Sequence, residues 1–164
     1  SNKKHEIEIN DEEIPDLPAL VMMCKDAKKG KDGDLFLFYD ENGNEQDVKA
    51  YHVNEYIQDI SGEKFTAKDF RTWGGTKLAA KSIAKFRKKD NKKQRKKNVT
   101  IMIKEVSTKL GNTPAVCRGS YIHPRFLTDY MRGSFFRLWK ETLGEPMYPL
   151  TENESHVIRY LENS

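Results

Sequence analysis

The stretch LGNTPAVCRGSYIHP, from Leu110 to Pro124, contains two helix boundaries and one tyrosine in a basic setting. Gly111 is suited to end one helix, and Pro114 is suited to the first turn of the next. The second helix carries Tyr121, which is either an ordinary packed side chain or a nucleophile directed at a phosphate. A free phenol is a weak nucleophile because its pKa is near 10. Neighbouring cations favour the phenolate, however, and tyrosine is a known covalent catalyst.

Helical patterns continue on both sides of this stretch. Apolar residues recur with helical spacing from Val99 to Leu110 and form one stripe. Other helices are predicted over 17–28, 48–60, 67–86, 125–139 and 151–162. The last of these opens with a capping box formed by Thr151 and Glu154. Residues 5–9 alternate between polar and apolar, as a short strand does. The predicted fold class is therefore mainly α, multi-helical, with a small β element at the N-terminus.

The composition excludes several classes of protein. Charged residues make up 33% of the chain, against about 25% on average, but Leu, Ile, Val and Phe still number 36, enough for one core. No run approaches the roughly 18 apolar residues of a membrane span, and no signal peptide or G-x-x-x-x-G-K-[ST] nucleotide loop is present. Cys24 and Cys117 lack metal-ligand spacing. We expect no disulfide, metal or cofactor, and a cytoplasmic location (at the nucleoid if the source is bacterial) rather than the nucleus.

Charge is distributed unevenly, although the net charge is only +4. Residues 1–63 are rich in acid and residues 64–140 carry most of the base, which favours a polyanionic partner for the second part. From Lys85 to Lys97, nine of thirteen residues are Lys or Arg. We interpret this run as a solvated linker that can also contact the phosphates of double-stranded DNA. The candidate DNA-binding side chains are Arg87, Lys88, Lys92, Lys93, Arg95, Lys96 and Arg118.

A second motif, KDFRTWGGT, occupies residues 68–76. Lys68 and Arg71 are three residues apart, so they share one face of a helix and can grip one phosphate. The alternative is an ordinary solvated basic face. Gly74 and Gly75 each cost about 1 kcal/mol inside a helix, which indicates either close packing or a kink.

Together, KDFRTWG, the basic run, the amphipathic helix and LGNTPAVCRGSYIHP resemble the catalytic domain of type IB DNA topoisomerases, of the short bacterial and poxvirus kind. The resemblance covers residues 5 to 145, and the order and separation of the two motifs fit the family. It implies the multi-helical fold that type IB topoisomerases share with tyrosine recombinases. Residues 1–164 would then be a catalytic-domain fragment. Its parts are a β/helix segment over 1–47, a helical core over 48–150 with a basic linker over 85–97, and a C-terminal helix over 151–164.

The resemblance assigns roles to four residues. Tyr121 matches the nucleophile, and Arg71 matches an arginine that contacts the scissile phosphate. Lys68 matches a position that assists nearby. Asn112 matches a residue, nine positions before the nucleophile, that donates a hydrogen bond to a phosphate oxygen. Poxvirus members carry His at the Asn112 position, whereas bacterial members carry Asn, which donates without titrating.

The family also uses a second Arg and a general-acid Lys, which come earlier in the chain. That Lys lies in a hairpin turn before a His that begins the return strand, and His5 resembles this His. The acid would then precede Ser1, with Lys3 or Lys4 as the alternative if the register differs. We therefore expect a C-terminal fragment that lacks two of five active-site residues and the amino-terminal clamp domain, and that is nearly inactive alone.

The implied activity is relaxation of supercoiled DNA by a monomer, without ATP or metal. Tyr121 attacks a phosphodiester, a 3′-phosphotyrosyl link forms, the 5′-hydroxyl leaves, the strand rotates, and the hydroxyl reseals the break. Two alternatives remain open. A tyrosine recombinase or integrase shares this chemistry, but its motif is normally His-x-x-Arg where this chain has Lys68 and Arg71, and it works as a tetramer. The other alternative is a non-catalytic DNA-binding domain.

Overall fold

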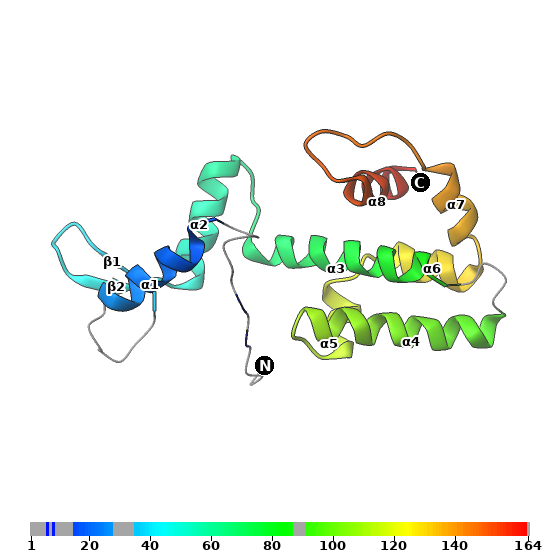
Figure 1. Ribbon diagram of the computed structural model, residues 1–164, viewed down its shortest axis with the longest axis horizontal. Helices are drawn as coiled ribbons and strands as arrows, with labels where there is room; N and C mark the ends of the chain where they lie inside the picture. The colour runs from blue at the N-terminus through cyan, green and yellow to red at the C-terminus, as the bar shows by residue number, and fades with distance from the viewer. Residues whose placement is uncertain (1–5, 7, 9–14, 28–34, 87–90, 164) are drawn as a thin grey trace. The chain divides into compact units, whose positions relative to one another are not determined.

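The computed structural model describes residues 6, 8, 15–27, 35–86 and 91–163. The chain divides into two compact units. Among the described residues, those up to Ala67 form the N-terminal unit and those from Lys68 onward form the C-terminal unit. The described residues contain eight helices and one two-stranded sheet, which confirms the mainly helical fold with a small β element (Figure 1). The sheet lies within 37–47, whereas most of the strand predicted over 5–9 falls outside the described residues.

The described part of the N-terminal unit consists of two helices and a hairpin. Its elements are α1 (Leu17–Ala27), β1 (Leu37–Tyr39), β2 (Glu45–Asp47) and α2 (Ala50–Ser61). The two strands are antiparallel, with Leu37 opposite Asp47. In the turn between them, the carboxylate of Asp40 accepts hydrogen bonds from the backbone N–H groups of Asn44 and Asn42, at 2.9 and 3.0 Å. The bond from Asn44 contributes most to holding the pKa of Asp40 below its ordinary value.

Helix α2 confirms the helix predicted over 48–60. It ends at Gly62, whose φ of 67° places it in the left-handed region where glycine is favoured. The N–H group of Gly62 donates to the carbonyl of Gln58 at 2.9 Å. The side chain of Asn54 accepts a hydrogen bond from the N–H group of Ala67, the last residue of this unit, at 3.0 Å. No residue of α2 is buried.

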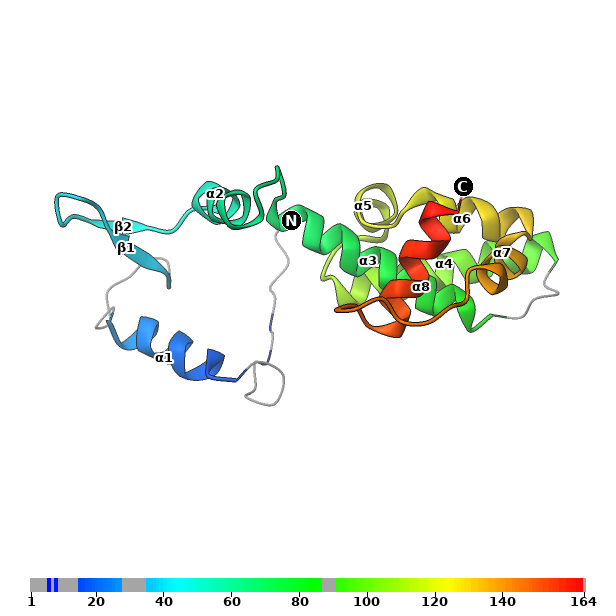
Figure 2. The ribbon, with the colours of Figure 1, turned by 90° about the horizontal axis from the view of Figure 1, so that it is seen from above.

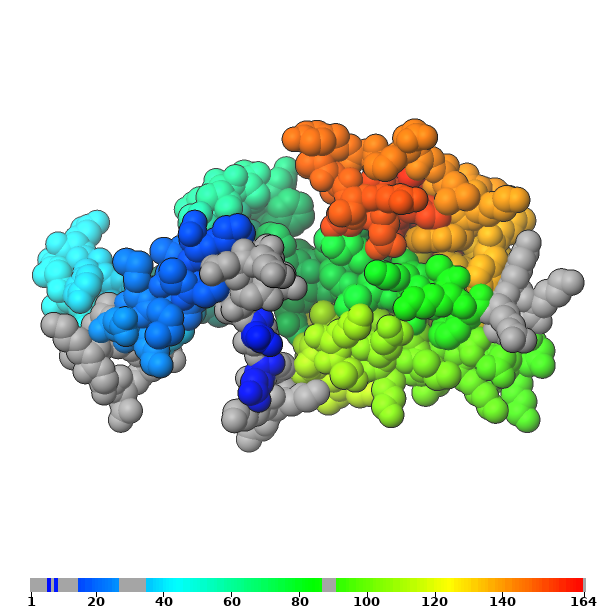
Figure 3. All heavy atoms as spheres, in the orientation of Figure 1, coloured from blue at the N-terminus to red at the C-terminus, as the bar shows by residue number. Residues whose placement is uncertain are grey.

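The C-terminal unit contains the remaining six helices of the described chain. They are α3 (Ala67–Ala84), α4 (Lys92–Lys109), α5 (Pro114–Ser120), α6 (Pro124–Arg132), α7 (Phe135–Glu141) and α8 (Glu152–Glu162). Helix α8 lies against α3, as the views from above and with all atoms show (Figures 2 and 3), and Lys77 of α3 pairs with Glu154 of α8 at 2.6 Å. Within the ranges that the structure describes, no helix has the length and apolar character needed to cross a membrane.

The core of the C-terminal unit is aromatic. Its largest fully buried side chains are Tyr130, Tyr160, Phe126 and Phe135. The rings of Phe126 and Tyr160 stack with centroids 4.8 Å apart, which joins α6 to α8. Trp139 packs against this cluster. The aromatic residues of α6 and α7 thus belong to the core or pack against it.

Two buried polar side chains of the core are hydrogen-bonded to each other. The side-chain amide of Asn98 in α4 donates to the hydroxyl of Tyr130 in α6 at 2.6 Å. The carbonyl oxygen of the same amide accepts a hydrogen bond from the side chain of Gln94 at 2.9 Å. Because buried polar groups are costly when unpaired, these bonds favour one register between α4 and α6.

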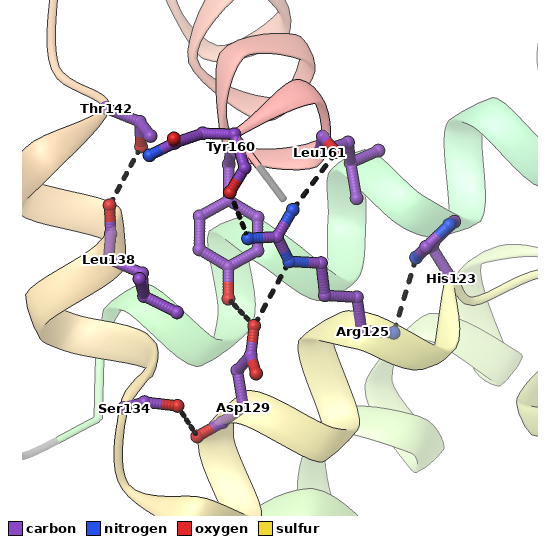
Figure 4. Close-up of polar contacts among 9 residues, drawn as sticks. His123, Arg125, Asp129, Ser134, Leu138, Thr142, Tyr160 and Leu161 are labelled. Carbon is purple, nitrogen blue, oxygen red and sulfur yellow. Dashed lines mark hydrogen bonds and ion pairs between the residues drawn. The ribbon is translucent and has the colours of Figure 1, made fainter.

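A second polar network connects α6 to the C-terminal helix (Figure 4). The carboxylate of Asp129 accepts hydrogen bonds from the hydroxyl of Tyr160 at 2.7 Å and from Nε of Arg125 at 3.2 Å. The two terminal nitrogens of Arg125 donate to the carbonyls of Leu161 and Asn163, at 3.0 and 2.6 Å. Burial, and then the bond to Asp129, raise the pKa of Tyr160. Arg125 is thus engaged within the unit.

The linker predicted over 85–97 is wrong in its second half. Helix α4 begins at Lys92, and the side chain of Asn91 caps it by accepting a hydrogen bond from the N–H group of Gln94 at 2.9 Å. Lys, Gln and Arg are good helix formers because their straight side chains lose little freedom in a helix. Because these residues show no apolar periodicity, the sequence did not predict the first two turns of α4. Residues 87–90 lie outside the described part of the chain.

The single helix predicted over 125–139 is also wrong, since it is divided into α6 and α7. Gly133 ends α6 with a φ of 87°, a left-handed conformation that glycine adopts without a steric penalty. The guanidinium of Arg95 lies against Gly133, so that a Cβ atom built there would be 3.2 Å from Nη1 of Arg95. The break therefore makes room for a side chain of α4.

Candidate active site

One face of α3 carries the first half of the site. Lys68, Arg71, Thr72, Gly75 and Thr76 follow the helical spacing of this face. The helix continues through both glycines. Of the two explanations for the glycine pair, close packing applies to Gly75: a Cβ atom there would lie 3.0 Å from Cβ of Tyr121 and closer still to its carbonyl oxygen.

Tyr121 lies directly after the last residue of α5, at the C-cap. Pro114 occupies the first turn of α5, as predicted, and the side chain of Thr113 caps the start of this helix. The N–H group of Tyr121 donates to the carbonyl of Cys117 at 3.0 Å, and the Tyr121 side chain is half-buried. The short helix therefore holds the backbone of Tyr121 against the core, because Cys117 is fully buried.

Arg71 and Asn112 meet at one oxygen atom. Nη2 of Arg71 donates to the carbonyl of Leu110 at 2.6 Å, and the side-chain amide of Asn112 donates to the same carbonyl at 3.1 Å. This carbonyl lies at the C-terminus of α4, where the last carbonyls have no partner inside the helix. Its partial negative charge therefore attracts both donors.

Tyr121 lies beside this pair of donors. The guanidinium carbon of Arg71 is 5.2 Å from the centre of the Tyr121 ring. Burial raises the pKa of the Cys117 thiol, and the positive charge of Arg71 partly opposes this increase. Arg71, Asn112 and Tyr121, predicted from segments up to fifty residues apart, thus lie in one place. Lys68 is exposed on the same face of α3, one turn before Arg71.

Two threonine hydroxyls fix the turn that follows α5, and neither was predicted. The Thr76 hydroxyl lies 3.5 Å from the carbonyl of Tyr121 and accepts a hydrogen bond from the N–H group of His123 at 3.3 Å. The Thr72 hydroxyl lies 3.4 Å from the carbonyl of Ser120 and 3.1 Å from the carbonyl of Lys68 in its own helix. The only sequence signal for these residues is their helical spacing from Arg71.

His123 takes part in the next helix boundary. Its Nδ1 accepts a hydrogen bond from the N–H group of Arg125 at 3.3 Å, which caps α6. Burial, and then the charge of Arg125, lower the pKa of His123. A neutral ring is the form that accepts this bond. In this position His123 serves as the N-cap of α6.

The predicted DNA-binding side chains fall into three groups. Lys92, Lys93, Lys96 and Arg118 are exposed. Arg118 also lines a groove between α4 and α5 together with Lys104. Arg95 packs against Gly133, so its guanidinium is turned into the unit. Arg87 and Lys88 lie outside the described residues. Among the residues that are described, no group of three or more His, Cys, Asp or Glu side chains is arranged to hold a metal ion.

Comparison with known proteins identifies the family. Residues 4–132 match the family model of the eukaryotic DNA topoisomerase I catalytic core. Because this match takes in well over half of the chain and all four predicted site residues, the chain belongs to the DNA topoisomerase I catalytic-core family.

A curated viral protein shows the same relationship. DNA topoisomerase 1B of Acanthamoeba polyphaga mimivirus is 36% identical to this chain over 113 residues, which are 64% of this chain and 34% of the viral protein. The chain thus spans about a third of the length of this relative. Both matches confirm the resemblance to type IB topoisomerases, and they favour this family over the tyrosine recombinases.

Proposed function

We propose that this protein is a type IB DNA topoisomerase, in which Tyr121 is the nucleophile and Arg71 and Asn112 bind the scissile phosphate. The observation that carries the proposal is the convergence of Arg71 and Asn112 on the carbonyl oxygen of Leu110, beside the ring of Tyr121. Two donors that reach one oxygen atom can also reach one non-bridging oxygen of a phosphodiester. In the bound state the phosphate would replace the Leu110 carbonyl as their acceptor.

The chemistry is a transesterification. The hydroxyl oxygen of Tyr121 attacks phosphorus and loses its proton, the bond from phosphorus to the 5′-oxygen breaks, and that oxygen takes up a proton. A 3′-phosphotyrosyl bond replaces the phosphodiester bond, so resealing needs no nucleotide. Arg71 and Asn112 stabilise the negative charge that grows on the phosphate in the transition state, and Lys68 supplies further positive charge from the same face. Loss of one such donor typically costs about 10²–10³ in rate.

The partner in this proposal is double-stranded DNA. The chain carries 21 of its 29 Lys and Arg residues from Lys68 onward, where only 9 of its 25 Asp and Glu residues lie. Exposed Lys92, Lys93, Lys96 and Arg118 would contact phosphates on either side of the cleavage point, and such contacts are sensitive to salt. We further propose that the protein acts as a monomer, in contrast to a recombinase tetramer.

The test uses a DNA duplex that contains a sulfur atom at the 5′-bridging position of the scissile phosphate. A thiolate leaves without a proton donor, so cleavage does not require a general acid and reports on Tyr121 and on the residues that bind the phosphate. A detergent-resistant protein–DNA adduct is expected for the unaltered protein. Tyr121→Phe should abolish the adduct while DNA binding stays within a few-fold. Tyr148→Phe is the matched control, because Tyr148 is 98% exposed outside the site.

Arg71→Ala tests the phosphate site. We expect adduct formation to slow by about 10²–10³ with little loss of binding, because the arginine acts mainly on the transition state. Arg137→Ala removes an exposed arginine of α7 that pairs with Glu141 and should leave the rate unchanged. If Tyr121→Phe retains the adduct, Tyr121 is not the nucleophile. If neither the unaltered protein nor any variant forms an adduct and DNA still binds, the protein is a non-catalytic DNA-binding domain.

A further inference from the structure

The two adjacent glycines of α3 differ in their surroundings. A Cβ atom built on Gly74 would meet no atom within 4 Å. A Cβ atom built on Gly75 would lie 3.0 Å from Cβ of Tyr121 and 3.1 Å from its carbonyl carbon, with its carbonyl oxygen nearer still. Only Gly75 therefore needs the absence of a side chain. These atoms belong to the backbone or sit directly on it, so no flexible side chain can move aside.

Gly75 lies on the face of α3 that carries Arg71, one turn further along. The hydroxyls of Thr72 and Thr76 reach the same segment, at the carbonyls of Ser120 and Tyr121. Gly75 permits this close approach, and the hydroxyl of Thr76, which accepts a hydrogen bond from the N–H group of His123, holds the segment in place. The distance between α3 and the backbone of Tyr121 also sets where the phenol lies relative to Arg71.

We infer that Gly75 is a positioning residue for strand cleavage: its missing side chain lets the Tyr121 backbone rest on α3, which places the phenol against Arg71. This inference rests on the proposed role of Tyr121 as the nucleophile. A methyl group at Gly75 would force α3 and the Tyr121 segment apart by about 1 Å, since carbon atoms in ordinary contact are 3.5–4.0 Å apart. A misplacement of this size can cost about 10²-fold in rate.

The matched pair Gly75→Ala and Gly74→Ala isolates the contact. Both changes replace a glycine in the middle of the same helix, so both bring the same gain in helix propensity. Only Gly75→Ala introduces the clash with Tyr121. Any difference between the two variants therefore reports the approach of α3 to Tyr121.

The first readout is single-turnover formation of the covalent adduct on the sulfur-containing duplex, together with the Kd for uncleaved DNA. We expect Gly75→Ala to form the adduct about 10²-fold more slowly with a Kd within threefold of the unaltered protein, and Gly74→Ala to retain the full rate. A defect of folding alone would instead lower the amount of active protein, and so the amplitude of the reaction rather than its rate constant.

The second readout does not require activity. Amide hydrogen exchange of His123, whose N–H group donates to Thr76, should become faster in Gly75→Ala and stay unchanged in Gly74→Ala. Equal cleavage rates for the two alanine variants, or unchanged exchange at His123, would overturn the role of Gly75 while leaving Tyr121 as the nucleophile. An adduct that survives Tyr121→Phe would instead overturn the proposed function, and the role of Gly75 with it.

Discussion

The C-terminal unit has a closed core, whereas the described part of the N-terminal unit has none. In the C-terminal unit Phe126, Tyr130, Phe135 and Tyr160 are at most 1% exposed. In the N-terminal unit no described residue is buried. Its large apolar side chains remain accessible, as Tyr56 at 64% exposed illustrates. Local hydrogen bonds, such as those that Asp40 and Gly62 make, take the place of a core there.

This difference explains where the candidate site is found. Lys68, Arg71, Asn112 and Tyr121 all belong to the unit with the closed core. Catalytic geometry must be held to a fraction of an ångström, which requires side chains and backbone fixed by packing. We therefore expect the free energy of unfolding to depend strongly on the C-terminal unit and weakly on exposed apolar residues of the N-terminal unit.

The largest effect is expected from Phe126→Ala. Phe126 is 0% exposed and stacks on Tyr160, so its removal leaves a cavity and should lower the free energy of unfolding by about 3–5 kcal/mol. Tyr56→Ala removes a comparable ring from α2 and should change it by less than about 0.5 kcal/mol. Chemical denaturation measures both. Similar losses for the two variants would mean that the N-terminal unit buries Tyr56 in solution.

A smaller effect is expected when the link between α6 and α8 is weakened. Tyr160→Phe removes the hydroxyl that donates to Asp129 at 2.7 Å and leaves the packing of the ring intact. Because the bond is buried and its acceptor is ionised, the loss should be about 1.5–3 kcal/mol. Tyr148→Phe makes the same chemical change at a residue that is 98% exposed and should have no effect. A stability of Tyr160→Phe equal to that of Tyr148→Phe would show that this bond contributes nothing.

Gly62→Ala tests the N-terminal unit by itself. Alanine is disfavoured by about 1–2 kcal/mol at the φ of 67° found here, so the C-terminal end of α2 should open more readily. Hydrogen exchange should accelerate in α2 and stay unchanged in α4 and α6. Acceleration throughout the chain would contradict the division into two units.

The smallest effect concerns the pair of Lys77 and Glu154, whose side chains are 30% and 18% exposed. The hydrogen bond from Lys77, followed by those from Thr151, holds the pKa of Glu154 at about 2, below its ordinary value of 4.5. Since this pKa is lower in the folded protein, the stabilisation is present above about pH 4.5 and is lost as the pH falls toward 2.

Lys77→Met should therefore lower the free energy of unfolding by no more than about 1 kcal/mol at pH 7, and by progressively less as the solution is acidified below pH 4.5. Thermal unfolding at several pH values measures this difference. Arg137→Met, in a more exposed pair with Glu141, serves as the control and should have a smaller effect. A difference that grows as the pH falls would have the wrong sign for this account.

The features that were predicted correctly from the sequence depend on residues that are neighbours along the chain. Pro114 in the first turn of α5 and the capping box of Thr151 and Glu154 depend on residues within one turn, and the structure confirms them. The start of α4 at Lys92 was missed because a run of charged residues has no apolar period, although Asn91 is a good cap. The break at Gly133 was missed although glycine is a common helix end. The packing of Arg95, 38 residues earlier, against Gly133 has no local signal.

The same distinction applies to the candidate site. The spacing of Lys68 and Arg71 and the resemblance to a family indicated which residues to expect. The carbonyl of Leu110 as the shared acceptor, and the contact between Gly75 and Tyr121, join segments that are 39 and 46 residues apart. Such contacts depend on how α3, α4 and α5 pack, which no local pattern specifies.

The most direct test of the proposed site is to locate the covalent bond to DNA. Trypsin should release Tyr121 in the peptide Gly119–Arg125, because Arg118 and Arg125 flank it. After nuclease digestion of the trapped adduct, mass spectrometry should find a nucleotide joined through its 3′-phosphate to Tyr121 in this peptide. A nucleotide on any other peptide, on Ser120, or joined through a 5′-phosphate would contradict the assignment.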